Sequence, residues 1–392
     1  MILLLAACTT DAVDWHGEVR PALNGSCVRC HTEGGQGPGD FTDLDQARTW
    51  APYMVEAIDE GSMPPPAADP SCNDYLGSEH LQLPEGTLEM LQDWIDHDMP
   101  EGDPEDAPDA PAIVAELADP DLVVTLDEPY TPAFPDEGNE YRCFVLEHGQ
   151  TEDFFITKMA PVIDNLAVVH HVVLFAVEPE YLPPDNDVGA GFDCIDNAFI
   201  GGDDATSVVD GNGMIAGWGP GAVPTEFVDD AGLRVKSTQK LILQMHYYES
   251  DEAETFADQS GYAFNITDEV DERLLMAPLG ISGFQIPANT EGYTYSDAFV
   301  LPVGLTVHSV FPHMHQMGRS YEVTVDEDCM IRGDYDFDNQ LPYTFTDPVE
   351  VEANARIEVS CTWDNDTDEV VRYGERTDEE MCFAFAMLSL GG

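Results

Sequence analysis

The chain of 392 residues exceeds the usual size of one globular domain, which predicts two or three folded units. It carries 77 acidic and 14 basic residues, and its formal net charge of −63 argues against binding nucleic acid or anionic lipid through basic patches. We interpret the acidic residues as a solvated surface. After the first eight residues, no apolar run approaches the roughly 20 residues that are needed to cross a bilayer. A lipid anchor is therefore the only membrane attachment that we expect.

The first eight residues, MILLLAAC, resemble a bacterial lipoprotein signal that is cut before Cys8 so that Cys8 can be lipidated. The apolar run is short and no basic residue precedes it, which suggests a misplaced start codon or a trimmed sequence. A plain secretory signal is the alternative. Both interpretations place the protein outside the cytoplasm, in a bacterial periplasm or, when lipid-anchored, at the outer membrane or cell surface.

A C-x-x-C-H motif follows at Cys27, Cys30 and His31. Two thiols at this spacing can form thioethers to the vinyl groups of haem, and the imidazole that follows becomes an axial ligand of the iron. The alternatives are a redox C-x-x-C or half of a zinc site, but neither a βαβ pattern nor a second Cys/His pair accompanies the motif. The motif therefore predicts one covalent c-type haem.

A second axial ligand is expected further along a small all-α domain. Apolar spacing predicts helices over 43–58 and 85–97, and Met63 lies between them on a proline-stiffened loop. We take Met63 as this ligand, while leaving open His80, His97, Met54 and Met90. Residues 14–103 resemble the small cytochrome c domains of bacterial proteins.

The segment 104–117 is acidic and rich in proline, which predicts a stiff linker. Beyond it, short apolar or alternating runs stand between Gly, Pro, Asp and Asn clusters, as is typical of β-strands. The predicted strands are 121–126, 141–147, 153–159, 166–177, 240–248, 258–265, 291–300, 304–313, 319–326, 356–363 and 382–389. The chain is thus predicted to be mainly β, with two consecutive antiparallel, jelly-roll-like β-sandwich domains over 118–272 and 273–392.

Five of the eleven histidines lie in apolar runs beyond the predicted linker, namely His170, His171, His246, His313 and His315. Residues two apart in a strand project from one face, so His313 and His315 can offer two imidazoles to one metal. Adjacent strand residues point to opposite faces, so His170 and His171 can share a metal only at a strand end or β-bulge. When the runs around 170 and 246 are considered singly, their histidines can be explained as buried side chains whose nitrogens form hydrogen bonds.

Taken together, the runs resemble the copper type II ascorbate-dependent monooxygenase family over roughly 140–390. In that family a His-His pair and a later His in a Leu-Gln-x-His-Tyr context bind one copper, and a His-x-His pair with a Met in a Glu-Met-Cys context binds another. The resemblance implies an electron-relay copper at His170, His171 and His246. It also implies a catalytic, O2-activating copper at His313, His315 and Met381.

Together with the N-terminal signal and the C-x-x-C-H motif, the resemblance implies an exported haem and copper monooxygenase that hydroxylates a C–H bond of a small organic substrate with O2. Single electrons would come from the fused cytochrome, an ascorbate-like reductant or a quinol chain. The alternative is a non-catalytic lipoprotein that transfers electrons or holds copper. The distinct methionine site favours the enzyme, because copper storage does not need two different ligand sets.

Three positions depart from the peptide-hydroxylating members of the family. An Arg two residues before the His-x-His pair and an Asn two residues after the Met help those members to hold a peptide carboxylate. Here Phe311 and Phe383 stand at these positions, and Phe385 replaces a Tyr. We therefore expect an apolar or neutral substrate.

Nine cysteines are present, and lipid and haem attachment account for three of them. The remaining six allow fifteen pairings. The resemblance implies a disulfide between Cys361 and Cys382. We name Cys143 with Cys194 as a candidate pair, and Cys72 and Cys329 are not placed by the sequence.

Overall fold

The structure, a computed structural model, describes most of the chain. The described residues are 13–33, 35, 37–108, 116–135, 138–182, 189–193, 211–219, 222, 224–227, 230–249, 253, 255–337, 339–374 and 378–390. The predicted signal at 1–8, with Cys8, lies outside them, and so does Cys194. Among the described residues, no helix is both long enough and apolar enough to cross a membrane.

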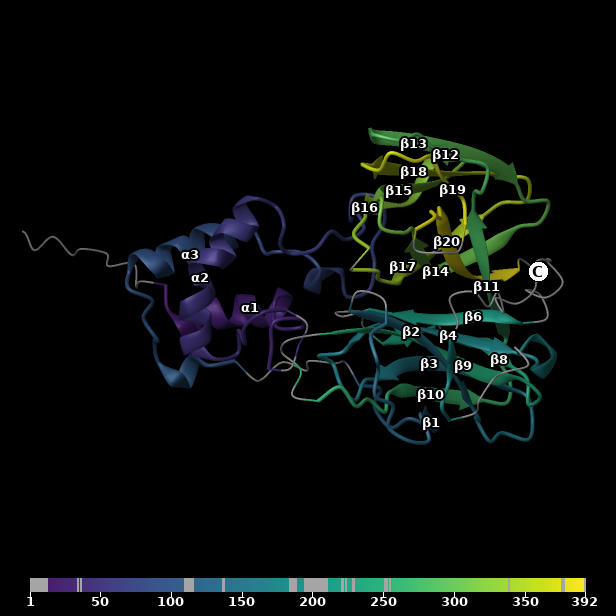
Figure 1. Cartoon of the computed structure of the whole chain (residues 1–392), viewed down its shortest axis with the longest axis horizontal. Coiled ribbons are helices and arrows are strands. Elements are labelled where there is room, and N and C mark those ends of the chain that lie inside the picture. The colour runs from purple at the N-terminus through teal and green to yellow at the C-terminus, as the bar shows by residue number, and fades with distance from the viewer. Residues whose placement is uncertain are drawn as a thin grey trace, which may run out of the picture. The chain divides into compact units, whose positions relative to one another are not determined.

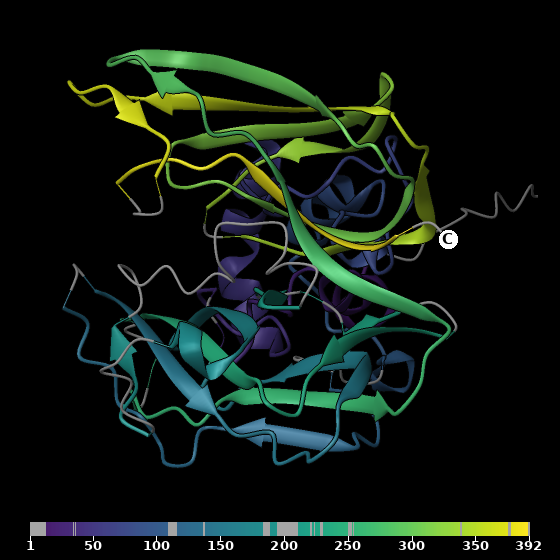
Figure 2. The same ribbon diagram turned by 90° about the vertical axis from the view of Figure 1, so that its right-hand side faces the viewer.

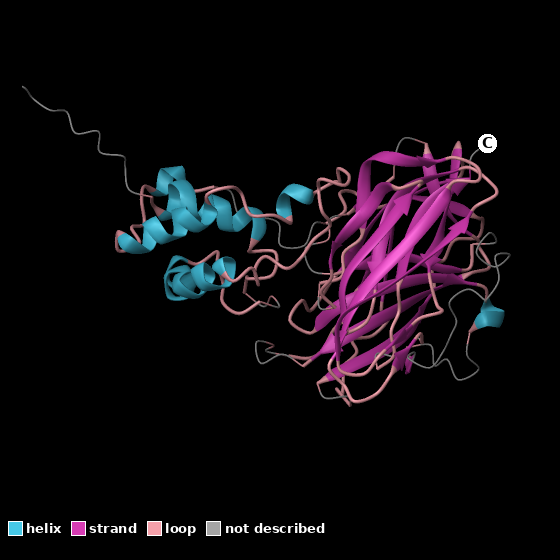
Figure 3. Ribbon diagram, turned by 90° about the horizontal axis from the view of Figure 1, so that it is seen from above, coloured by secondary structure: helices cyan, strands magenta, loops and turns pink. Residues whose placement is uncertain are grey.

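The chain folds into two compact units. The first consists of Met1–Pro65 and Glu79–Ile113, and the second of Pro66–Ser78 and Val114–Gly392. The segment Pro66–Ser78, called the strap below, therefore belongs to the second unit although it interrupts the first in sequence. Helices gather in the first unit and strands in the second (Figure 3).

The first unit is a small helical fold, as the sequence predicts. Trp15 and Trp94 stack in its core with ring centroids 5.9 Å apart, and both are almost fully buried. Asp43 caps the longest helix by accepting from the backbone N–H of Gln46. The helical elements are η1 (Trp15–Val19), α1 (Arg20–Ser26), α2 (Leu44–Asp59), η2 (Ser78–His80), α3 (Thr87–Asp96) and η3 (Pro104–Asp106).

The second unit is mainly β and is built from several sheets (Figures 1 and 2). Its first half contains β1 (Leu122–Thr125), β2 (Asn139–Leu146), β3 (Phe154–Val162), β4 (Val169–Val177), η4 (Pro179–Tyr181), β5 (Phe192–Asp193), β6 (Gly213–Trp218), β7 (Thr225–Glu226), β8 (Ala231–Val235), β9 (Lys240–Tyr248) and β10 (Gly261–Thr267). Its second half contains β11 (Glu272–Gly280), β12 (Gln285–Ile286), β13 (Thr290–Val300), β14 (Leu305–His313), β15 (Gly318–Val325), β16 (Asp328–Asp334), β17 (Tyr343–Val351), β18 (Arg356–Asn365), β19 (Val371–Arg372) and β20 (Phe383–Leu390).

One nine-stranded sheet runs through both halves, in the order β1-β10-β3-β8-β11-β20-β14-β17 with β7 beside β3. The two halves join where β8 pairs with β11. That pair is parallel, whereas every other strand pair that the structure describes is antiparallel. One sheet therefore runs through both segments, 118–272 and 273–392, for which the sequence predicts two consecutive sandwich domains.

Each half also has a larger sheet of its own, and the second half has a further two-stranded sheet, β12-β19. The five-stranded sheet β5-β2-β9-β4-β6 lies in the first half, and the four-stranded sheet β13-β18-β15-β16 lies in the second. The five-stranded sheet is buried on both faces. On β2, Phe144 and Leu146 enter the large core cluster of the first half, whereas Cys143 and Val145 enter a second cluster that includes Phe311 of β14. Burial on both faces explains why these strands read as nearly continuous apolar runs.

Candidate metal centres

Three histidines of the first half converge at one place. His170 and His171 lie at the start of β4, and His246 lies on the neighbouring strand β9. The pairing register shifts between Val169 and His171, so His170 is the extra residue of a bulge. The bulge turns two adjacent side chains toward one point, which is the arrangement that the sequence requires if they are to share a metal.

The converging atoms are the Nδ1 nitrogens. Nδ1 of His171 lies 3.2 Å from Nδ1 of His170 and 3.3 Å from Nδ1 of His246. At His246, Nε2 lies 2.8 Å from Oδ1 of Asn139, an acceptor, so Nε2 carries the proton and Nδ1 keeps its lone pair. Tyr141 stacks on the His246 ring with centroids 4.1 Å apart. A donor set of three imidazoles suits copper, zinc or iron.

Burial keeps these imidazoles neutral. It lowers the pKa of His171 well below the ordinary value, and the neighbouring histidines lower it further. Burial and then His170 lower the pKa of His246 in the same way. A neutral imidazole is the form that binds a metal.

A second pair of histidines lies in the second half. His313 ends β14, and His315 follows in the turn before β15, so the pair does not share one strand as the sequence suggests. The rings nevertheless come together, with centroids 5.2 Å apart. Burial and then His315 lower the pKa of His313 to about 3.

Both rings of this pair present Nε2. Nδ1 of His313 lies 2.8 Å from Oε1 of Gln340, whose Nε2 donates to the carbonyl of Phe337 and so fixes the amide orientation. Nδ1 of His315 lies 3.0 Å from the carbonyl of Glu379. Both partners are acceptors, so each Nδ1 carries the proton and each Nε2 is left with its lone pair.

Glu380 joins the turn after β14 to the segment before β20. Its fully buried carboxylate accepts from the backbone N–H of His315 at 2.9 Å, the N–H of Met317 at 2.7 Å and Nε1 of Trp363 at 3.0 Å. Burial raises the pKa of Glu380 to about 7. The next residue is Met381, which is itself buried.

A disulfide also holds the same segment. Cys382 bonds to Cys361 on β18, with an S–S distance of 2.07 Å. The disulfide expected from the sequence is therefore present. Met381 thus lies between a buried carboxylate and a covalent cross-link.

Aromatic residues surround His313 at the positions that depart from the peptide-hydroxylating pattern. The Phe385 ring lies 6.1 Å from that of His313, and the Phe311 ring lies 6.3 Å from it, measured between centroids. Phe383 stacks on Phe385 at 5.8 Å. Phe311 is 6% exposed and contributes to the core between the two halves. The surroundings of His313 on this side are therefore apolar.

Sequence comparison covers the part of the chain that builds these centres. Residues 129–254 match the copper type II ascorbate-dependent monooxygenase N-terminal domain, and residues 282–388 match the C-terminal domain of the same family. The chain carries both copper type II ascorbate-dependent monooxygenase domains. The two matches agree with the family resemblance that the sequence shows over roughly 140–390.

The two monooxygenase domains have a curated relative in the mouse. DBH-like monooxygenase protein 2 of Mus musculus is 26% identical over an alignment of 278 positions, and the match covers 64% of this chain and 43% of the mouse protein. The chain thus matches less than half of that relative's length.

Solved structures add no argument about the fold. A crystal structure of the infectious bursal disease virus VP2 subviral particle is 11% identical and covers 71% of this chain and 74% of its own, with a TM-score of 0.17. A structure of the Gx strain of the same virus, also 11% identical, covers 71% of this chain and 73% of its own with a TM-score of 0.16.

Outside the monooxygenase domains, the C-x-x-C-H motif lies in the helical unit. Nδ1 of His31 lies 2.8 Å from the carbonyl of Pro38, so Nδ1 carries the proton and Nε2 keeps its lone pair. The His31 ring stacks on Phe41 with centroids 4.3 Å apart. Cys27 and Cys30 are unpaired thiols, and burial raises the pKa of Cys27 to about 11.

The candidates for a second haem ligand differ in their surroundings. Met54 is buried in the core of the helical unit and Met90 packs against that core. Met63 is 41% exposed. Nδ1 of His80 lies 3.1 Å from the carbonyl oxygen of Gly25, and Nδ1 of His97 lies 2.8 Å from the carbonyl oxygen of Asp93. Met63 as the ligand stays a prediction.

The structure also places cysteines that the sequence leaves open. Cys72 of the strap bonds to Cys329 of β16 with an S–S distance of 2.01 Å. Cys143 is buried and disulfide-bonded. Its pairing with Cys194 stays a prediction because Cys194 is outside the described residues.

Three supporting residues are not marked by the sequence, namely Asn139, Gln340 and Glu380. Asn139 is 107 residues from His246, and Gln340 is 27 residues from His313. No local spacing marks such pairs. Glu380 is the one that could have been found, because it lies next to Met381 in the motif that the family resemblance rests on.

Proposed function

We propose that the protein is a haem and copper monooxygenase that hydroxylates a C–H bond of an apolar or neutral organic substrate with O2. The observation that carries the proposal is the convergence of the Nδ1 atoms of His170, His171 and His246, whose three metal-binding atoms lie within 4.8 Å of one another. Neutral nitrogens at about 3.2 Å repel when both carry lone pairs, and a shared cation removes that repulsion.

In this proposal the two copper sites take different ligands. His170, His171 and His246 hold the electron-relay copper, while His313, His315 and Met381 hold the copper at which O2 reacts. A thioether is a soft ligand that favours Cu(I). When bound, each copper can store one of the two electrons needed to place one oxygen atom in a C–H bond and reduce the other to water.

Supporting residues fix the nitrogen that each histidine offers. Asn139 holds the proton of His246 on Nε2, whereas Gln340 and the Glu379 carbonyl hold those of His313 and His315 on Nδ1. Glu380 binds the backbone of His315 and precedes Met381, so one carboxylate orients two of the proposed ligands.

We extend the proposal to the helical unit, which would hold one covalent c-type haem through Cys27 and Cys30 with His31 as an axial ligand. The residues fit this group. A catalytic redox C-x-x-C needs a thiol of lowered pKa, whereas the pKa of Cys27 is raised. His31 offers Nε2 because its Nδ1–H donates to Pro38. Met63 is the proposed second ligand, and the haem would supply single electrons to the first copper.

The substrate class follows from the residues around His313. Phe311, Phe383 and Phe385 form an aromatic group there, and none of them can pair with a carboxylate. The substrate is therefore an apolar or neutral molecule. A neutral analogue should bind at least ten times more tightly than its carboxylate counterpart, as isothermal titration of the copper-loaded protein can measure.

We also propose that the protein works outside the cytoplasm. Disulfides such as Cys72–Cys329 and Cys361–Cys382 persist in oxidising compartments. Lipidation of Cys8 would tie the protein to a membrane in the bacterial periplasm or at the outer membrane or cell surface. Its electron donor would then be a cytochrome, an ascorbate-like reductant or a quinol chain.

Metal analysis and oxygen uptake test the proposal together. We expect two coppers and one haem iron per chain, with reductant-dependent oxygen uptake that a substrate stimulates. The alternative is a non-catalytic lipoprotein that transfers electrons or holds copper. Two bound coppers without oxygen uptake, across a mass-spectrometric screen for substrates that gain one oxygen atom, would favour that alternative.

A further inference from the structure

The strap is held along two strands of the second half. At its start, Ala68 pairs with Gly333 of β16, and the N–H of Asp69 donates to the carbonyl of Arg332 at 2.8 Å. At its end, Tyr75 pairs with Phe345 of β17, and the N–H of Leu76 donates to the carbonyl of Thr344 at 2.9 Å. The strap therefore extends the hydrogen bonding of both strands.

Both strands are sheet edges. β16 is the last strand of the four-stranded sheet, and β17 is the last strand of the nine-stranded sheet. Unpaired edge strands invite association with other chains, and proteins commonly cover them. The strap covers part of each edge of the second half.

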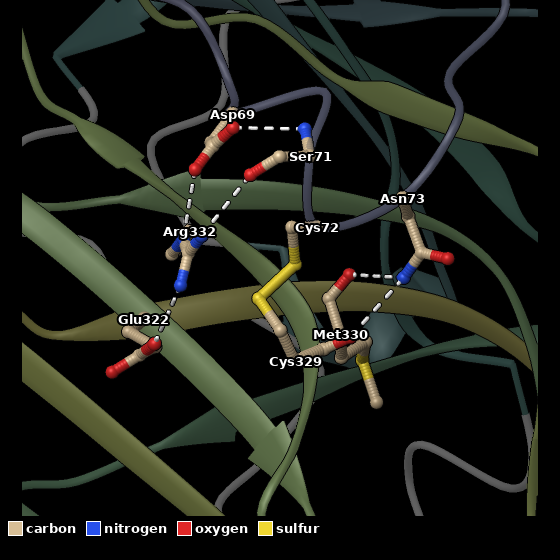
Figure 4. The surroundings of a disulfide bond; sticks show 8 residues. All are labelled: Asp69, Ser71, Cys72, Asn73, Glu322, Cys329, Met330 and Arg332. Atoms are coloured by element: carbon tan, nitrogen blue, oxygen red, sulfur yellow. Dashed lines mark hydrogen bonds and ion pairs between the residues drawn. A yellow bond between two sulfur atoms is a disulfide. The ribbon is translucent and has the colours of Figure 1, made fainter.

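Side chains fasten the strap to β16 (Figure 4). The disulfide Cys72–Cys329 links them covalently, and Nδ2 of Asn73 donates to the carbonyl of Met330 at 2.7 Å. Arg332 donates to Oδ2 of Asp69 at 2.9 Å and to Oγ of Ser71 at 3.1 Å.

The strap also packs closely against β16 and β17. Tyr75 is 4% exposed and its ring lies 5.4 Å from that of Tyr343 and 5.5 Å from that of Phe345. A Cβ atom at Gly333 would lie 3.0 Å from the carbonyl oxygen of Ala67, so glycine allows the strap to approach β16 closely.

One contact connects the strap to a proposed copper ligand. Nδ2 of Asn339 donates to the carbonyl of Pro66, the first residue of the strap, at 3.0 Å. The next residue is Gln340, which is buried and accepts from Nδ1 of His313 at 2.8 Å. The strap thus holds the loop whose side chain sets the tautomer of His313.

We propose that the strap positions His313 through Asn339 and Gln340, so that a segment interrupting the helical unit completes the second copper site. The inference rests on the proposed function in taking His313 as a copper ligand. Asn339 and Gln340 are positioning residues, since neither is proposed to touch the metal. The strap lies outside both segments that match the monooxygenase family, so the family pattern does not supply it.

The first test needs no copper. In the full-length, metal-free protein labelled with 15N-histidine, the ring signals report which nitrogen of His313 carries the proton. Asn339→Asp keeps the size of the side chain but removes the N–H donor to Pro66. We expect wild type to show one Nδ1–H tautomer and N339D to show a mixture.

A matched variant separates this effect from a general disturbance. Nδ2 of Asn265 also donates to a backbone carbonyl, that of Asp119, at 3.0 Å, but it lies on β10 of the first half. N265D should leave the His313 signal unchanged. Unchanged His313 signals in N339D, or equal changes in both variants, overturn the proposal.

The second test measures copper at the two sites separately. N339D should weaken copper binding at His313 about tenfold and leave the His170 site unchanged, because partners that orient metal ligands contribute on the order of tenfold to affinity. Copper binding at His313 that equals wild type overturns the proposal. A wild-type protein that binds no copper refutes the proposed function instead, and the 15N signals then still decide whether the strap positions His313.

Cys72→Ser combined with Cys329→Ser provides an independent variant of the full-length chain. Loss of the cross-link should shift the His313 ring signals in the same direction as N339D. Unchanged signals in a double variant whose strap amides have lost their protection from hydrogen exchange would overturn the proposal. The exchange measurement shows whether the strap was released.

Discussion

At the scale of single residues, the two candidate centres share one structural feature. A hydrogen bond to one imidazole nitrogen decides which nitrogen can bind a metal. Asn139 leaves Nδ1 available at His246, whereas Gln340 leaves Nε2 available at His313. The same ring type therefore presents different atoms at the two proposed copper sites.

The role of Asn139 in fixing the tautomer of His246 can be tested by substitution. Asn139→Leu removes the acceptor at about the same size, so the proton of His246 can move to Nδ1 and compete with copper. We expect copper affinity at the first site to fall about tenfold. Asn139→Asp retains an acceptor and should behave nearly as wild type. Competition with a copper chelator measures both, and equal affinities in all three proteins would contradict the assignment.

Glu380 permits a second prediction at this scale. Glu380→Gln keeps the shape but replaces one of the two carboxylate oxygens, which accept from His315, Met317 and Trp363, with an N–H₂ group. Leaving buried donors without an acceptor costs about 1–3 kcal/mol. We expect the urea midpoint of the metal-free second unit to fall accordingly. The exposed Glu352→Gln is the control and should change stability by less than about 0.5 kcal/mol.

The residues proposed as ligands could be singled out from the sequence, but most of their hydrogen-bond partners could not. His313 and His315 stand out by spacing alone. Their acceptors come from residues brought close only by the fold, such as Gln340 in the loop before β17. A polar residue in a loop has many possible roles, so its identity carries little information before the fold is known.

At the scale of elements, many of the longer strands with apolar patterns were predicted, whereas β6, β8, β11, β16 and β17 were missed. β11 carries Pro278 and β17 carries Pro348, which weaken a strand pattern. β17 tolerates its proline because it ends the sheet. β16 is short and partly charged, as suits an edge strand. An edge position, which the sequence does not show, thus explains β16 and β17, whereas β11 is a central strand despite its proline.

The disulfide between β18 and the segment before β20 gives a prediction at this scale. Cys361 and Cys382 are 21 residues apart, and closing a loop of that length stabilises a fold by about 3 kcal/mol. Cys361→Ser with Cys382→Ser should lower the free energy of unfolding by about that amount. It should also weaken copper at the Met381 site while the His170 site is retained. Denaturant unfolding and copper titration of one preparation measure both effects.

An unaffected Met381 site in that variant would contradict the role of the disulfide in placing Met381. Since Glu380 holds the same segment through three hydrogen bonds, combining Glu380→Gln with the two serine substitutions distinguishes the two anchors. Neighbouring changes in one network are not expected to add. The combined variant should therefore lose more copper affinity than the sum of the separate losses.

At the scale of the whole molecule, the two units are linked more than once. The chain passes between them at Pro65–Pro66, at Ser78–Glu79 and at Ile113–Val114. The sequence predicts a helical domain over 14–103 joined to the rest by one linker, and nothing in its composition marks the strap as part of the other unit. Cys72 shows the connection only in the structure, where it bonds to Cys329, 257 residues away.

The extra links can be tested by cutting one of them. A protease site inserted between Ile113 and Val114 allows that junction to be cleaved in the folded protein. The fragment that ends at Ile113 contains Cys72, whereas Cys329 lies in the other fragment. On a denaturing gel without reductant, the cleaved protein should therefore migrate as one species. Reductant should separate it into two bands, because the disulfide is then the sole covalent link.

Cys72→Ser combined with Cys329→Ser is the control, and its cleaved form should give two bands with or without reductant. Two bands from the parent protein without reductant would contradict the strap as a covalent part of the second unit. One band that persists in the serine variant would point to a different cross-link.

A truncated chain that begins at Val114 would lack the strap that covers β16 and β17. Because uncovered edge strands invite association, we expect this chain to associate at concentrations where the cleaved, disulfide-linked protein stays monomeric.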